Sequence, residues 1–296
     1  MSVITFVDNK DEECGKTLSL VAIATHIAIE QNLKILIIST TDKEDRVGSC
    51  FFVEKEQVRK IKRGIFGENT KALEIESGIE GVVKLVRSNK LTASLITNYT
   101  RVVFKNRLEL LLGKEKINDE ENKKEENSLD PLSNKPIDEE YINIIANASQ
   151  YYDRVFVDLD MNVSEENRKR ILEMSDLVIT TTSQNFKSLD ELREKKMQSE
   201  FLNSTKNLFL IGRYDKYSKY NAKNVTRFLN EKNQILTVPY NTLYFEAAGE
   251  AGVPDLFLRL RKMNDPDDRN AIFKSEIKRA ADNINYRLEE LKARLY

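Results

Sequence analysis

The fold of this chain is decided by two adjoining stretches, Val3-Ile-Thr-Phe-Val7 and Asp8-Asn9-Lys10-Asp11-Glu12-Glu13-Cys14-Gly15-Lys16-Thr17. The first is apolar and β-branched, which is typical of a buried strand, and the second is a polar loop. Residues 16–31 then repeat apolar side chains at helical spacing, and residues 34–39 contain an unbroken apolar run, typical of a strand covered on both faces. Strand, loop, helix and strand in this order predict a βαβ unit.

Further apolar runs continue this pattern towards the C-terminus. They lie at residues 154–159, 177–181, 208–212 and 235–238, and most are separated by helical stretches near residues 165–174, 188–201 and 222–231. Because strands that alternate with helices build parallel sheets, we expect an α/β fold. It would be a doubly wound, mostly parallel sheet with helices on both faces.

Two regions depart from the alternation. Residues 56–113 predict mainly helix, and residues 114–140 are so rich in Lys, Glu and Asn that they predict an exposed insertion. We therefore expect one domain over residues 1–258 that carries this insertion, followed by a C-terminal helical extension over residues 259–296.

The composition excludes several classes of function. The chain has 296 residues, a net charge of −1, two cysteines (Cys14 and Cys50) and one histidine, His26. A disulfide framework, a four-ligand zinc site and Ser-His or Cys-His catalysis therefore lack residues, and His26 is interpreted as a partly buried helix residue. No run approaches the roughly 20 apolar residues of a membrane span, and the N-terminus does not resemble a signal peptide, so we expect a cytoplasmic protein.

The tripeptide Gly15-Lys16-Thr17 carries the predicted chemistry. It follows a strand and opens a helix, as the core of a phosphate-binding loop does. In such a loop glycine lets backbone N–H groups turn towards the phosphates, lysine contacts them, and the hydroxyl binds Mg²⁺. The alternative is a helix start that reads Gly-Lys-Thr by coincidence.

The order of the motifs resembles the ParA/MinD branch of the SIMIBI-class P-loop ATPases. The stretch from Tyr152 to Asp158 is similar to the Walker B strand of that branch, Gly212-Arg213 stands at its Asn-Arg position, and Val238-Pro239-Tyr240 resembles its purine-side loop. The resemblance covers most of residues 1–258. It implies ATP and Mg²⁺ as ligands and a nucleotide site made by Gly15, Lys16, Thr17, Asp158, Arg213 and Pro239, with Thr17 and Asp158 on the Mg²⁺ side.

The same correspondence shows departures from the family pattern. The signature lysine of the family falls on Asp11, its two following glycines fall on Glu12 and Glu13, and the second aspartate of its Asp-x-Asp motif falls on Thr41. A carboxylate about 4 Å from a phosphate charge costs about 4 kcal/mol at an effective dielectric of about 20, whereas one that points into solvent costs little. The sequence leaves both orientations of the glutamates open. We expect weak binding of ATP and weak or absent hydrolysis.

The C-terminal segment has a heptad seam, in which apolar residues recur at four- and three-residue steps. The seam consists of Ile277, Ala281, Ile284, Leu288, Leu291 and Leu295. Packing on the chain's own domain, a homodimer that forms without ATP, and membrane contact all remain open. Residues 266–296 contain seven basic and six acidic residues, a balance that argues against direct binding to anionic lipid.

A second region, residues 214–227, interleaves basic and aromatic side chains. This pattern is compatible with contact with phosphate backbone or with an acidic partner, but we interpret it as a loop and helix start near the edge of the nucleotide site. The rest of the sequence offers no support for nucleic acid.

Two functions follow from different classes. The first is a nucleotide-binding protein with eroded ATPase motifs, which acts through protein partners in the positioning or assembly of a cellular cargo, of the partition, pilus or secretion type. The second is a docking or scaffold module that keeps only the fold. Within the ParA/MinD branch the CpaE/TadZ proteins have similarly loosened motifs, and the stretches Ser77-Gly78-Ile79 and Asn98-Tyr99-Thr100 resemble theirs. Gly15-Lys16-Thr17 and Asp158 favour the first, and Asp11, Glu12, Glu13 and Thr41 favour the second.

Overall fold

The computed structural model describes residues 1–9, 14–41, 46–53, 78–113 and 137–294. Within these residues a single sheet has eight strands in the order β3-β4-β2-β5-β1-β6-β7-β8. All neighbouring pairs are parallel except β3 and β4. The strands are β1 (Ser2–Asp8), β2 (Ile35–Ser39), β3 (Arg101–Phe104), β4 (Leu108–Leu111), β5 (Arg154–Asp158), β6 (Leu177–Thr182), β7 (Asn207–Tyr214) and β8 (Leu236–Pro239).

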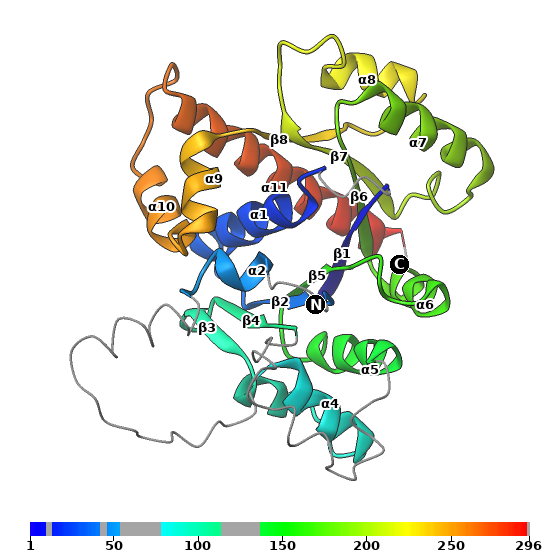
Figure 1. The fold of residues 1–296 in the computed structure, drawn as a ribbon, viewed down its shortest axis with the longest axis vertical. Helices are drawn as coiled ribbons and strands as arrows, with labels where there is room; N and C mark the ends of the chain where they lie inside the picture. The colour runs from blue at the N-terminus through cyan, green and yellow to red at the C-terminus, as the bar shows by residue number, and fades with distance from the viewer. Residues whose placement is uncertain (10–13, 42–45, 54–77, 114–136, 295–296) are drawn as a thin grey trace, which may run out of the picture.

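Helices cover both faces of this sheet (Figure 1). One face packs against α1 (Lys16–Glu30), α2 (Arg46–Ser49), α9 (Thr242–Gly249), α10 (Val253–Leu260) and α11 (Arg269–Ala293). The other packs against α4 (Ile79–Arg87), the 3-10 turn η1 (Leu95–Asn98), α5 (Asp138–Ala148) and α6 (Glu165–Met174). A smaller cluster joins α7 (Phe186–Gln198) and α8 (Ala222–Phe228) to β7. The predicted α/β fold is therefore confirmed.

The central strands formed where the sequence predicted them. All residues of β2 and β6 are buried, and those of β1 are buried as far as Val7, because helices lie above and below them. An unbroken apolar run is favourable only in such a position. The expected strands near 154–159, 208–212 and 235–238 are β5, β7 and β8.

Residues 56–113 were predicted to be mainly helical, and this prediction is wrong for their C-terminal part. Residues 101–111 form the antiparallel pair β3 and β4, joined by a turn in which Asn106 has a φ of 60°. Asparagine tolerates this left-handed conformation, so it favours the turn. Residues 54–77 of this region lie outside the described part of the chain. So do residues 114–136 of the expected insertion, and its last three residues, 138–140, begin α5.

The C-terminal seam packs on the chain's own sheet. Ile277, Ala281, Ile284 and Leu288 are at most 1% exposed and belong to the core cluster that contains α1 and the sheet. Leu291 is partly buried against the same cluster. These residues belong to α11, which begins after Asp268, whose carboxylate accepts hydrogen bonds from two backbone N–H groups. The helix α11 lies beside α1 and β8. The hypothesis that these four side chains form a dimer contact is wrong, since the protomer itself covers them; Leu295 lies outside the described residues.

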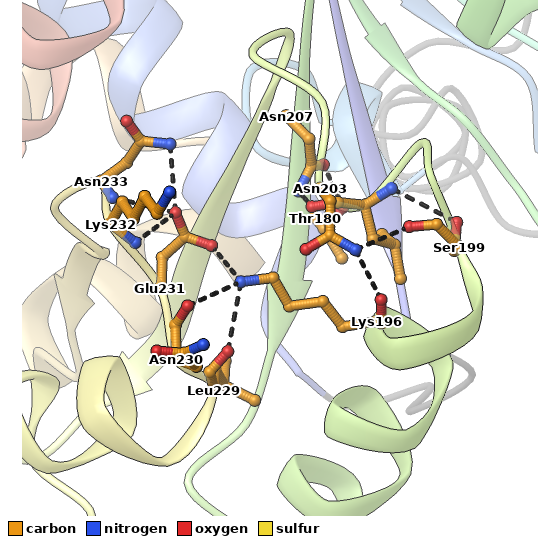
Figure 2. A network of polar contacts seen from close by, with 11 residues as sticks. Thr180, Lys196, Ser199, Asn203, Asn207, Leu229, Asn230, Glu231, Lys232 and Asn233 are labelled. Carbon is orange, nitrogen blue, oxygen red and sulfur yellow. Dashed lines mark hydrogen bonds and ion pairs between the residues drawn. The ribbon is translucent and has the colours of Figure 1, made fainter.

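A buried ion pair secures the β7–β8 edge of the sheet. The Lys196 ammonium of α7 lies 2.6 Å from Glu231 Oε2, and both side chains are at most 9% exposed. Figure 2 shows that Lys196 also donates to the carbonyl oxygens of Leu229 and Asn230, at the end of α8. A cation there satisfies carbonyls that the helix leaves without partners. The pair thus links α7 to the segment that leads into β8.

Candidate nucleotide site

The candidate site lies at the carboxyl end of β1, where the phosphate-loop motif stands. Gly15 is the residue before α1, and its φ of 81° lies in the left-handed region that glycine adopts without strain. Strand β5 is paired in parallel with β1, so that Phe6 is opposite Asp158. This register brings the last residue of β5 next to the first residues of α1. Residues 10–13, which include Asp11, Glu12 and Glu13, lie outside the described part of the chain.

Lys16 is the centre of the site. Its Nζ lies 3.2 Å from Asp158 Oδ1 and 3.2 Å from Asp8 Oδ2, and it donates a hydrogen bond of 2.5 Å to the Leu159 carbonyl oxygen. The lysine side chain is 10% exposed, and the two carboxylates are about as buried. An ammonium group has three N–H bonds. One of these N–H bonds donates to Leu159, and the ammonium forms ion pairs with both carboxylates, so Lys16 is held by partners within the chain.

The electrostatics of this cluster keep Lys16 charged. Burial lowers the pKa of Lys16, but the negative charges and hydrogen bonds of Asp158 and Asp8 outweigh that effect and raise the pKa above its ordinary value. A lysine that stays protonated at every physiological pH is suited to hold an anion.

Thr17 and Asp158 form the second part of the site. The Thr17 hydroxyl donates a hydrogen bond of 2.7 Å to Asp158 Oδ2, and Asp158 is 7% exposed. A threonine hydroxyl beside a carboxylate is the pair of oxygen ligands that Mg²⁺ takes in P-loop proteins. Lys16, Thr17 and Asp158 thus fit a magnesium nucleotide: the lysine would contact phosphate, and the two oxygen groups would stand on the metal side.

The end of β2 supports the same region through backbone and hydroxyl contacts. Thr40 donates from its hydroxyl to the Asp158 carbonyl oxygen at 3.2 Å and accepts from the Asp160 N–H at 2.8 Å. It thereby holds the turn that follows β5. Thr41, at the position of the family's second aspartate, carries no charge, and Asp42 lies outside the described residues.

Gly212 and Arg213 pack closely against Cys14 and Gly15 of the phosphate loop. A Cβ on Gly212 would lie 2.1 Å from the Cys14 carbonyl oxygen, and a Cβ on Gly15 would lie 3.2 Å from Arg213 Cγ. Arg213 is exposed and has a φ of 50°. Glycine at position 212 is therefore a requirement of close packing between β7 and the loop.

Pro239 ends β8 at the outer edge of the sheet. It pairs with Tyr214 of β7, and the next residue, Tyr240, donates its N–H to the Tyr214 carbonyl oxygen at 3.2 Å. The structure thus unites Gly15, Lys16, Thr17, Asp158 and Arg213. It places Pro239 one strand further out, at the end of β8 beside Tyr214.

Asp8 is the residue of this site that the sequence analysis missed. Its position at the end of β1 is visible in the sequence, but only the fold shows that its carboxylate contacts Lys16. His26, in contrast, is 7% exposed within α1, as expected of a helix residue with a structural role. Among the described residues, no group of three or more His, Cys, Asp or Glu could hold a metal ion. None of the helices there is long and apolar enough to cross a membrane.

The parallel sheet and the Lys16–Thr17–Asp158 cluster at the start of α1 define the P-loop NTPase fold. Comparison of the whole structure places it more narrowly, in the ParA/MinD-like form of that fold. No protein-family model matches the chain, and a search of curated proteins found no match either.

Three solved structures illustrate the similarity. A ParA family ATPase from Chlorobium tepidum matches with a TM-score of 0.64 at 14% identity, over 95% of this chain and 98% of its own. A plasmid partition protein from Borrelia burgdorferi bound to AMPPNP matches with a TM-score of 0.57 at 17% identity, over 94% and 97%. The septum site-determining protein MinD from Pyrococcus horikoshii, complexed with Mg-ADP, matches with a TM-score of 0.59 at 13% identity, over 96% and 95%. At such identities the similarity establishes the fold.

Proposed function

We propose that the chain is a ParA/MinD-like nucleotide-binding protein. It would bind ATP with Mg²⁺ weakly, hydrolyse it slowly or not at all, and act through protein partners in the positioning or assembly of a cellular cargo in the cytoplasm. The observation that carries this proposal is the contact of Lys16 and Thr17 with Asp158, at 3.2 and 2.7 Å, at the N-terminus of α1. Two of the similar structures contain AMPPNP or Mg-ADP, which supports the same ligands here.

Each residue of the cluster has a separate part in the proposed binding. Lys16 would supply positive charge to the phosphates, and the backbone N–H groups at the start of α1 would add hydrogen bonds and the favourable end of the helix dipole. Thr17 and Asp158 would hold Mg²⁺, which neutralises phosphate charge when bound. Arg213 and Pro239 would border the nucleotide on the side of β7 and β8.

Slow hydrolysis is proposed from what is missing around this cluster. Thr41 offers no carboxylate to position a water molecule, and Asp11 offers no cation at the family's signature-lysine position. We therefore expect phosphate release well below the rate of about 1 s⁻¹ at the low end of typical enzymes. A rate at or above it that is lost in Asp158→Ala would show that other residues replace the missing ones.

Titration calorimetry with ATP–Mg²⁺ tests the proposal. Lys16→Ala should abolish the binding heat of the wild-type protein, because it removes the cation at the centre of the site. Lys169→Ala is the matched control, since this lysine of α6 is 77% exposed and its ion pair within the described residues is with Glu173, at 3.9 Å. Identical heats for wild type and Lys16→Ala would refute nucleotide binding at this loop.

The second candidate function is the docking module that keeps the fold without the ligand. The observation in its favour is that Lys16 already forms one hydrogen bond and two ion pairs within the chain. Absence of any binding heat in the wild-type protein would favour this candidate.

A further inference from the structure

Asp8 is a charged residue that the proposed binding does not use. Its side chain is 12% exposed, and its Oδ2 lies 3.2 Å from the Lys16 ammonium. The other carboxylate oxygen, Oδ1, is buried and accepts no hydrogen bond from the described residues. A buried carboxylate oxygen without a donor is costly. Within the described residues, the ion pair with Lys16 is the contact that stabilises this side chain.

The three acceptors of Lys16 differ in how easily a phosphate could replace them. The Leu159 carbonyl belongs to the backbone that follows β5, and Asp158 also accepts from Thr17 on the proposed Mg²⁺ side. Asp8 does not belong to the backbone that follows β5, and it accepts no hydrogen bond from Thr17. A phosphate oxygen that approaches Lys16 Nζ would therefore displace the Asp8 carboxylate first.

The charge of the cluster acts in the same direction. Asp8 and Asp158 contribute two negative charges and Lys16 one positive charge, so the three groups together carry a net charge of −1. Salt screens buried charges less than exposed ones, so Asp8 would repel a polyphosphate at short range. Removal of its charge leaves Lys16 and Asp158 neutral as a pair.

We propose that Asp8 sets the nucleotide affinity of this site by competing with the phosphates for Lys16. This inference rests on the proposed function, and it assigns the expected weak affinity to one carboxylate of the described residues. Asp8 acts through Lys16, so it is a positioning residue whose effect extends to any polyphosphate.

The test compares the affinities of wild type, Asp8→Asn and Asp282→Asn by calorimetry, with ATP–Mg²⁺ and with tripolyphosphate–Mg²⁺. Asp8→Asn keeps the size of the side chain and its ability to accept a hydrogen bond, and Asp8→Ser is a second variant with the same loss of charge. Asp282→Asn is the control, because it removes one negative charge from an exposed pair with Lys278 on α11. We expect at least tenfold tighter binding of both ligands in either Asp8 variant and no change in the control.

Combining the Asp8 and Lys16 substitutions distinguishes competition for Lys16 from a general change of the electrostatic field at the phosphate site. In the background of Lys16→Ala, which is expected to abolish binding, Asp8→Asn should not restore it. Binding restored by Asp8→Asn in that background would overturn the proposal, and so would unchanged or weaker binding in the Asp8 variants that keep Lys16. Whether wild-type binding depends on Lys16 tests the proposed function separately. A failure of the proposed nucleotide binding can therefore be told apart from a failure of the proposed role of Asp8. Binding that appears only in the Asp8 variants would support the proposal.

Discussion

Leu288→Ala measures how much α11 contributes to the folded monomer. Leu288 is 1% exposed and lies in the core cluster shared by α11, α1 and the sheet. Truncation of a leucine in such a position removes its transfer free energy and leaves a cavity, which together cost about 2–5 kcal/mol. Domains are stable by about 5–15 kcal/mol, so the loss is a large part of the total. We expect the urea midpoint to fall clearly while the protein stays folded in buffer.

The assay combines urea unfolding, followed by circular dichroism, with analytical sedimentation. Tyr286→Ala is the control on the same helix, because this side chain is 69% exposed and its truncation should change the free energy of unfolding by no more than about 0.5 kcal/mol. The mass in sedimentation should be the same for both variants. A stable Leu288→Ala protein whose mass falls to that of a monomer, when the wild type is a dimer, would refute the packing argument and restore the seam as a dimer contact.

Three further substitutions test other parts of the structure. Gly212→Ala should weaken ATP–Mg²⁺ binding in calorimetry, because the added Cβ would lie 2.1 Å from the Cys14 carbonyl oxygen of the phosphate loop. Gly249→Ala is the control and should leave binding unchanged, because nothing lies within 4 Å of a Cβ added there. Lys196→Met should lower the free energy of unfolding by about 3–5 kcal/mol, because it leaves the buried Glu231 carboxylate without its cation, and a double variant with Glu231→Leu should recover much of the loss. Burial lowers the pKa of His26, so its contribution to stability is complete above its ordinary pKa of about 6.5 and is lost as the pH falls through the lower, folded-state pKa. Urea unfolding between about pH 7.5 and pH 5 should therefore show a steeper decline for wild type than for His26→Gln, and equal slopes would contradict this account.

The phosphate-loop region was predictable because its signals are local. A glycine with a positive φ, a lysine and a threonine at a helix start are adjacent in the sequence, and Asp158 ends an apolar run that could only be a strand. Asp8 carries no comparable signal. Its carboxylate meets Lys16 only in the folded chain, and the sequence does not contain that distance.

The apolar runs of this chain by themselves determined the central strands, because a strand covered on both faces must be apolar along its whole length. They did not determine β3 and β4: β3 is partly exposed at the sheet edge, so its composition resembles that of a half-buried helix. Nor did the heptad spacing of α11 decide between a partner and the chain's own core, since both bury the same stripe of side chains. Only the tertiary structure decided it, because the face of β8 and α1 that receives α11 is assembled from segments far apart in the sequence.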